Sequence, residues 1–342
     1  MRYFLLAALM AASLPGADRW IEYRSGPFHV MSNAGDKAAR DKLTELEQLR
    51  FVLGGMLGKN EPGKIEAGKE ELQATWPVDL ILFNGQKEYA AYILPRPLID
   101  GGSATLLAWY GEAPLPHDIV RDLTKRLVED NTGRTAAWVE TALEDLLCTI
   151  QVNATHVSIG APLGAGELDA TRLRAWAKLQ MLITQPEYSG KVHVYLNNLR
   201  QNGDESSAAR NAFDLTPQAL ESRVDAYVRA GNFAAVPVNG RAINPNRDYI
   251  EKPLAEPALT ELLAELKSGG KTPPPDSPRG LLAKGTRPAL ELAAKANPRW
   301  AEPHFRLGGL EDTPAGKIKE LKIATALEPR SGRRGIRGTR PS

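Results

Sequence analysis

The hydrophobic pattern predicts a pair of helices in the middle of the chain. Ile119, Leu123 and Leu127 recur every four residues, which is the spacing of one face of an amphipathic helix. The polar stretch 131–133 interrupts this series, and a second apolar series begins at Trp138 and continues to residue 147. A break this short leaves the two helices as antiparallel neighbours. We therefore expect a helical hairpin within residues 119–151.

Shorter apolar runs before the hairpin predict a small mixed sheet with helices packed on it. We expect strands at residues 20–23, 28–32, 78–83 and 103–110, and helices at residues 35–57 and 86–93. Ser32 or Asn33 is available as the N-cap of the first helix. Strands that alternate with helices in this order indicate an α+β fold.

The chain after the hairpin is mostly helical until its composition changes. We expect a strand at residues 155–160 and helices at residues 167–184, 188–201 and 217–230. Residues 266–288 are rich in proline and glycine and include three consecutive prolines, which is typical of an extended linker. The main domain is therefore expected to span residues 18–265, with the following segment attached loosely or not at all.

Two short motifs after the linker recur with a spacing of 31 residues, since Ala-Asn-Pro-Arg ends at Arg299 and Leu-Glu-Pro-Arg ends at Arg330. Residues 289–330 resemble a partial tetratricopeptide repeat, a short all-α segment with a usual period of about 34 residues. Such a repeat implies contact with another protein. Residues 331–342 show no apolar periodicity, and we expect a disordered basic tail there. A truncated or frame-shifted gene product would end in the same way.

The first residues have the features of a secretory signal peptide. Arg2 is followed by an apolar run at residues 3–14 and by small residues at 15–17. We expect residues 1–17 to be removed and the mature chain to be extracytoplasmic, either periplasmic or secreted. A short uncleaved anchor is the alternative, although the run of about twelve apolar residues is shorter than the ~20 that span a bilayer. No later stretch predicts a transmembrane segment.

The charge distribution argues against nucleic acid as a partner. The chain has a formal net charge of +2, and residues 330–342 contain five arginines and no acidic residue, so the remainder sums to −3. A folded part with this balance lacks the basic surface that nucleic acid requires. Cys148 is the one cysteine, and it cannot form an intramolecular disulfide. Its apolar neighbours predict a buried, unreactive thiol.

The second half of the hairpin, Trp138-Val139-Glu140-Thr141-Ala142-Leu143, resembles the active-site hairpin of peptidase MA-like (gluzincin-type) zinc metallopeptidases. In that family an H-E-x-x-H helix precedes a W-x-x-E-G-x-A helix, whose glutamate is the third zinc ligand. The resemblance covers about residues 20–232 and implies a zincin-like small mixed sheet with a helical C-terminal part. At the positions of the first histidine, the acid and the second histidine, this chain has Arg121, Asp122 and Lys125.

These substitutions predict that the hydrolytic site is absent. Zinc in such a site needs two neutral imidazoles one helical turn apart, with a carboxylate beside them as the base. Arg121 stays protonated in a protein and Lys125 is an ammonium ion, so neither attracts a dication. We therefore expect no cofactor, and we expect Arg121, or Lys125 as second choice, to form an ion pair with Glu140 or Glu144.

The predicted function is that of an exported, non-catalytic binding or scaffolding protein. Its cleft or its repeat would contact a protein or peptide partner. One alternative is a zinc-dependent peptidase with a rearranged ligand set made of His117, Asp118 and Glu140. Another is a truncated gene product without a function of its own.

Overall fold

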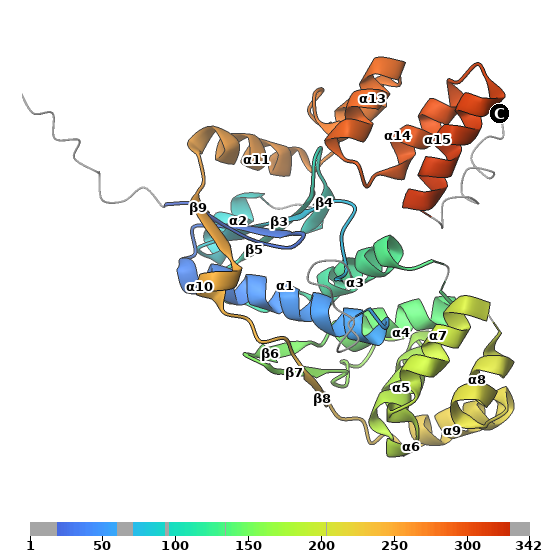
Figure 1. Cartoon of the computed structure of the whole chain (residues 1–342). Coiled ribbons are helices and arrows are strands. Elements are labelled where there is room, and N and C mark those ends of the chain that lie inside the picture. The colour runs from blue at the N-terminus through green and yellow to red at the C-terminus, as the bar shows by residue number, and fades with distance from the viewer. Residues whose placement is uncertain (1–18, 60–70, 93–95, 134, 203, 329–342) are drawn as a thin grey trace, which may run out of the picture.

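The computed structural model describes residues 19–59, 71–92, 96–133, 135–202 and 204–328. It has the mixed α+β composition that the sequence predicts (Figure 1). The predicted signal peptide 1–17 and the predicted basic tail 331–342 lie outside the described residues.

A six-stranded mixed sheet forms the centre of the N-terminal half. Its strand order is β4-β5-β3-β2-β1-β9, with parallel pairs between β5, β3 and β2 and antiparallel pairs elsewhere. The strands are β1 (Ile21–Ser25), β2 (Phe28–Ser32), β3 (Val78–Phe83), β4 (Leu98–Asp100), β5 (Thr105–Tyr110) and β9 (Ile250–Pro253). The predictions of β1, β2, β3 and β5 are confirmed. The edge strands β4 and β9 were not predicted. All four residues of β9 are exposed, so the sequence shows no alternation of apolar and polar residues there.

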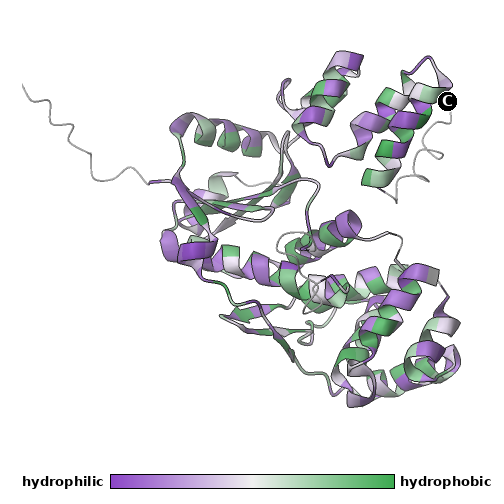
Figure 2. Ribbon diagram, viewed as in Figure 1, coloured by the Kyte–Doolittle hydropathy of each residue, from purple (hydrophilic) through white to green (hydrophobic). Residues whose placement is uncertain are grey.

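Helices cover both faces of this sheet (Figure 1). On one face the strands pack against α1 (Asp36–Met56) and the hairpin, and on the other they pack against α11 (Glu256–Ser268). Successive residues of β3 point to opposite faces of the sheet. Leu80 lies in the hydrophobic cluster on the α1 side, and Ile81 lies in the cluster on the α11 side. Figure 2 shows hydrophobic residues where the strands and these helices meet.

The predicted N-cap of α1 is wrong. Gly35 is the N-cap residue, and no side chain in the described part of the chain caps the helix. Asn33 is used elsewhere, because its Oδ1 accepts a hydrogen bond from the backbone of Asn84 at 2.8 Å and its Nδ2 donates to Glu88 at 2.9 Å. Ser32 Oγ accepts from the Ala34 backbone N–H at 2.9 Å. Asn33 therefore binds residues beyond β3, Ser32 closes a local turn, and neither side chain caps the first turn of α1.

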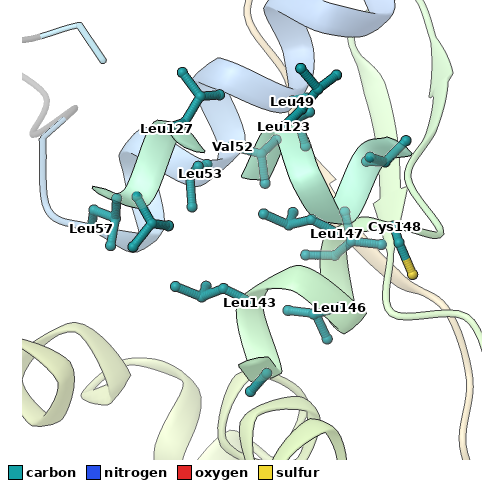
Figure 3. Packing of buried hydrophobic residues seen from close by; sticks show 14 of the residues in the cluster. Leu49, Val52, Leu53, Leu57, Leu123, Leu127, Leu143, Leu146, Leu147 and Cys148 are labelled. Carbon is teal, nitrogen blue, oxygen red and sulfur yellow. The ribbon is translucent and has the colours of Figure 1, made fainter. Parts of the chain in front are cut away.

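The predicted helical hairpin is confirmed as α3 (His117–Asn131) and α4 (Ala137–Leu147). Its apolar residues pack against α1 in one continuous cluster, which Figure 3 shows from close by. Leu49 and Leu53 of α1, Leu123 of α3, and Leu143 and Leu147 of α4 are almost completely buried in it. This packing fixes the position of both hairpin helices relative to the sheet.

Residues after the hairpin form a small antiparallel sheet and a group of helices. The sheet has the order β6-β7-β8 and consists of β6 (Gln151–Asn153), β7 (His156–Ile159) and β8 (Val236–Asn239). The helices are α5 (Ala170–Thr184), α6 (Pro186–Ser189), α7 (Val192–Asn202), α8 (Glu205–Phe213) and α9 (Pro217–Ala230). The helix expected at 188–201 is interrupted at Gly190, and α8 was not expected. Shorter helices elsewhere are α2 (Gln86–Tyr89), a 3-10 turn (Ala90–Tyr92) and α10 (Pro245–Asp248).

The stretch 266–288 differs from the extended linker that the sequence predicts. It contains the end of α11 and the helix α12 (Pro278–Lys284), which begins at the capping residue Ser277. Arg279 lies 4.0 Å from the ring centroid of Trp76 and donates a hydrogen bond to the Ala104 carbonyl at 3.1 Å. The stretch is therefore held on the β4–β5 end of the sheet by polar and cation–π contacts, which an apolar pattern cannot reveal.

Three helices follow, namely α13 (Arg287–Ala296), α14 (Ala301–Gly309) and α15 (Pro314–Leu327). They touch the main domain, since Trp300 packs edge-on against Trp76 at 4.7 Å and Asn297 donates to the Thr75 carbonyl at 3.0 Å. The prediction of a loosely attached segment is therefore wrong for residues 297–300. Among the described residues, no helix has the length and apolarity needed to cross a membrane.

Candidate functional site

A buried carboxylate lies between two arginines at the hairpin. Asp145 is on α4 and is 0% exposed. Its Oδ1 accepts from Arg121 Nε on α3 at 2.7 Å and from Arg172 Nη2 on α5 at 2.7 Å, and its Oδ2 accepts from Arg172 Nε at 2.9 Å. We call Arg121, Asp145 and Arg172 the Asp145 cluster. It links three helices through charge-assisted hydrogen bonds, which are stronger than neutral ones.

The backbone positions Arg172 for this contact. Asp169 caps α5 by accepting from the Arg172 backbone N–H at 2.8 Å, which places Arg172 in the first turn of the helix. Its hydrogen bonds to Asp145 raise the pKa of the Arg172 guanidinium above its usual value. An arginine side chain stays protonated in proteins, so Asp145 is the shared counter-ion of the Arg121 and Arg172 guanidiniums.

The predicted ion-pair partner of Arg121, Glu140 or Glu144, is wrong, and the actual partner is the residue that follows Glu144 on α4. Arg121 pairs with Asp145, and its Nη2 lies 3.8 Å from Glu167 Oε2, rather than pairing with Glu140 or Glu144. Neighbouring positions on a helix point about 100° apart, so the side chain that faces α3 at this level is the buried Asp145. The idea that a guanidinium neutralises a carboxylate of the second helix holds with this correction.

The other positions of the resemblance are scattered. Lys125 is exposed, Glu140 is half-buried, and Glu144 lies 3.6 Å from Arg172. Burial raises the pKa of Glu144, and the charges of Arg172 and Lys125 act against that rise. Asp122 forms an ion pair with Arg96. The structure thus brings only Arg121 into the Asp145 cluster.

The rearranged ligand set does not come together either. His117 Nδ1 lies 2.8 Å from Glu167 Oε2, while Asp118 is exposed at the start of α3. Hydrogen bonds from His117 and from the Gly164 backbone lower the pKa of Glu167. In the described part of the chain, no three His, Cys, Asp or Glu side chains are arranged to hold a metal ion. With Arg121 beside Glu167 and Asp145, the residues present here do not fit zinc.

Cys148 follows α4 and is 3% exposed. Burial raises the pKa of its thiol to about 12. At pH 8, about four units below that pKa, roughly one thiol in 10⁴ is ionised, and only the thiolate reacts. We expect iodoacetamide to label native Cys148 far more slowly than Cys148 in 6 M guanidinium chloride, and the native rate to rise with pH. Equal rates in the two conditions, measured by mass spectrometry, would contradict a buried thiol.

A second candidate site is a groove between α1, β6 and the segment 242–247. Its volume is about 840 Å³, within the range of ligand sites in proteins. The charged residues that line it are Asp41, Lys42, Glu45, Glu112 and Arg247. Because the groove combines charged side chains with Ile150, Val152 and Ile243, it can hold a ligand that has both polar and apolar parts.

Gln48 of α1 connects the walls of this groove. It is fully buried, and its Nε2 donates to the Arg241 carbonyl at 2.7 Å and to the Ala154 carbonyl at 3.2 Å. Its Oε1 accepts from the Arg241 backbone N–H at 2.8 Å. A buried amide with all these partners fixes the distance between the walls, so the groove exists before a ligand arrives.

Sequence reasoning missed Asp145, Arg172, Glu167 and the groove. A signal for Asp145 was present, because it interrupts the apolar series of α4 next to Leu146 and Leu147. No local pattern indicates Arg172, which is 27 residues away. The groove combines segments more than 190 residues apart, so no periodicity reports it.

No protein-family model, no curated protein and no solved structure matches this chain.

Proposed function

We propose that this chain is an exported, non-catalytic protein with a zincin-like fold, which binds or scaffolds a protein or peptide partner. Its helical C-terminal segment would be a partial tetratricopeptide-like repeat that adds a surface for protein contact. The proposed export depends on the first 17 residues, which lie outside the described part of the chain. The resemblance at Trp138 and Glu140 supports the proposed fold.

The Asp145 cluster is the observation that carries this proposal. At the hairpin level where the family has its first histidine, Arg121 occupies the space and donates to Asp145. Placing a dication there requires moving a guanidinium away from its buried counter-ion, and an unpaired buried charge costs several kcal/mol. The cluster therefore supports loss of the metal site together with retention of the hairpin.

The groove supports the binding part of the proposal. It is lined by charged and apolar side chains, and Gln48 holds its walls in place. The alternative, a peptidase that uses His117, Asp118 and Glu140, is less well supported because His117 pairs with Glu167. The truncated-gene alternative depends on the end of the chain, which is outside the described residues.

Metal analysis tests the non-catalytic assignment. We expect protein that has been equilibrated with zinc and then exchanged into zinc-free buffer to contain substoichiometric zinc by elemental mass spectrometry, and to leave fluorescent casein intact. Both follow from the cations at the ligand positions. The matched variants are His117→Ala and Glu140→Ala, neither of which should change the residual zinc. Stoichiometric zinc that either variant removes would overturn the proposal in favour of the rearranged ligand set.

A further inference from the structure

The β6 wall of the groove is the edge of the small sheet. Among the strands of the described residues, β6 pairs with β7 alone, and Asn153 pairs with His156 across the two-residue turn 154–155. In a hairpin closed by such a turn, the flanking pair exchanges both hydrogen bonds, and the next residue along points its backbone N–H and C=O away from the partner strand. That residue is Val152, which lines the groove.

An edge with an outward N–H and C=O is a template for another extended chain. An added strand lies about 4.8 Å from its neighbour, and the groove has a volume of about 840 Å³ in which to hold it. Ile150, Val152 and Ile243 supply apolar contacts for alternate side chains of such a segment. The shape and the backbone chemistry of this wall therefore fit an extended peptide better than a compact small molecule.

The accessible charge of the groove is acidic. Asp41 and Glu112 are 61% and 71% exposed, and the cation that pairs with both of them is the exposed Lys37. Exposed pairs of this kind are weak, so a cation of the ligand can replace Lys37. Lys42 is only 6% exposed and lies 2.7 Å from Glu45, which leaves little of its charge for a ligand.

Arg247 does not reverse this balance. Its side chain is 75% exposed and its Nε lies 2.7 Å from Asp248 Oδ1, so the pair offsets its charge only in part. The lining still has three carboxylates, those of Asp41, Glu45 and Glu112, against two cations. A ligand that enters the groove therefore meets the two exposed carboxylates of Asp41 and Glu112, while Glu45 and Lys42 offset each other. Lysine or arginine side chains are complementary to this surface.

We propose that the groove binds an extended, basic peptide segment, which adds to the free edge of β6 as a fourth strand of the β6-β7-β8 sheet. This inference deepens the proposed binding function and rests on it in one respect, that the peptide is held and not cleaved. The outward N–H and C=O of Val152 would bind the main chain of the peptide. The carboxylates of Asp41 and Glu112 favour positively charged side chains in it.

The test measures fluorescence anisotropy of three labelled peptides with the full chain. The probes are Val-Lys-Val-Arg-Val with blocked ends, its acidic counterpart Val-Glu-Val-Glu-Val, and the basic peptide with every backbone nitrogen methylated. We expect the basic peptide to bind, and the other two to bind at least about tenfold more weakly, because one lacks charge complementarity and the other lacks strand hydrogen bonds. Equal binding of the methylated and unmethylated peptides would overturn strand addition.

Variants of the chain locate the binding. Val152→Pro removes the outward N–H at an edge position that tolerates proline, and Val152→Ala is its control because it keeps the N–H. We expect at least about tenfold weaker binding for Val152→Pro than for Val152→Ala. The double variant Asp41→Asn with Glu112→Gln should lose a similar amount. Asp276→Asn, which removes a solvent-exposed acid outside the groove, should bind as the unmodified chain does.

The outcomes separate this inference from the proposed function. If the basic peptide binds with equal affinity to Val152→Pro and Val152→Ala, the site is elsewhere, so this inference fails and the binding function stands. If mass spectrometry shows the bound peptide to be cleaved, the non-catalytic function fails. If no probe binds, the inference fails, and metal analysis still decides the non-catalytic assignment independently.

Discussion

Replacing Asp145 by asparagine is expected to lower the free energy of unfolding by about 3 kcal/mol, because the change leaves two guanidiniums without their counter-ion. Arg121 is 17% exposed and Arg172 is 32% exposed, so neither can be solvated fully where it stands. The asparagine amide would also direct an N–H group toward a guanidinium that donates to Asp145 in the native chain. Urea unfolding followed by tryptophan fluorescence measures the loss.

Asp122→Asn is the matched control. Asp122 carries the same charge on α3, but it is 30% exposed and its partner Arg96 is 62% exposed. Pairs at such a surface contribute about 1 kcal/mol or less. If the two variants lost the same stability, the Asp145 cluster would have no special role, and the argument against a metal at the hairpin would lose its main support.

Gly270→Ala is expected to release the stretch 269–280 from the main domain. Gly270 has φ +68°, and a Cβ built there would lie 2.3 Å from the Asp100 carbonyl oxygen of β4. That distance is far below van der Waals contact and involves backbone, so the stretch has to move. Arg279, which is 18% exposed, would then lose its protected position. We expect trypsin to cleave after Arg279 at least about tenfold faster, which corresponds to about 1.4 kcal/mol easier opening.

Gly269→Ala separates backbone strain from this close approach. Gly269 has φ +65°, almost the same conformation, but nothing lies within 4 Å of its added Cβ. Both variants carry the cost of alanine at positive φ, which is about 1–2 kcal/mol. Only Gly270→Ala carries the collision with β4. Equal cleavage rates after Arg279 in the two variants would contradict the observed attachment of this stretch.

The elements that were predicted correctly are those whose burial follows a regular period. The hairpin has apolar residues at four-residue spacing because one face of each helix packs on α1, as Leu123 and Leu143 do. Strands β2 and β3 were found because nearly all of their residues are buried. The missed strand β9 is exposed at every position, so it is defined by its hydrogen bonds to β1 and not by its side chains.

At the candidate sites, too, some features could be predicted from the sequence and others depend on tertiary contacts. The sequence by itself determined that histidines are missing at positions 121 and 125, because residue identity needs no coordinates. Only the tertiary structure decided that Arg121 pairs with Asp145, that Arg172 joins them from α5, and that β6 faces a groove closed by residues 242–247. Ion pairs and grooves depend on distances between segments far apart in the chain, and helical or strand periodicity carries information only about the burial of one segment at a time.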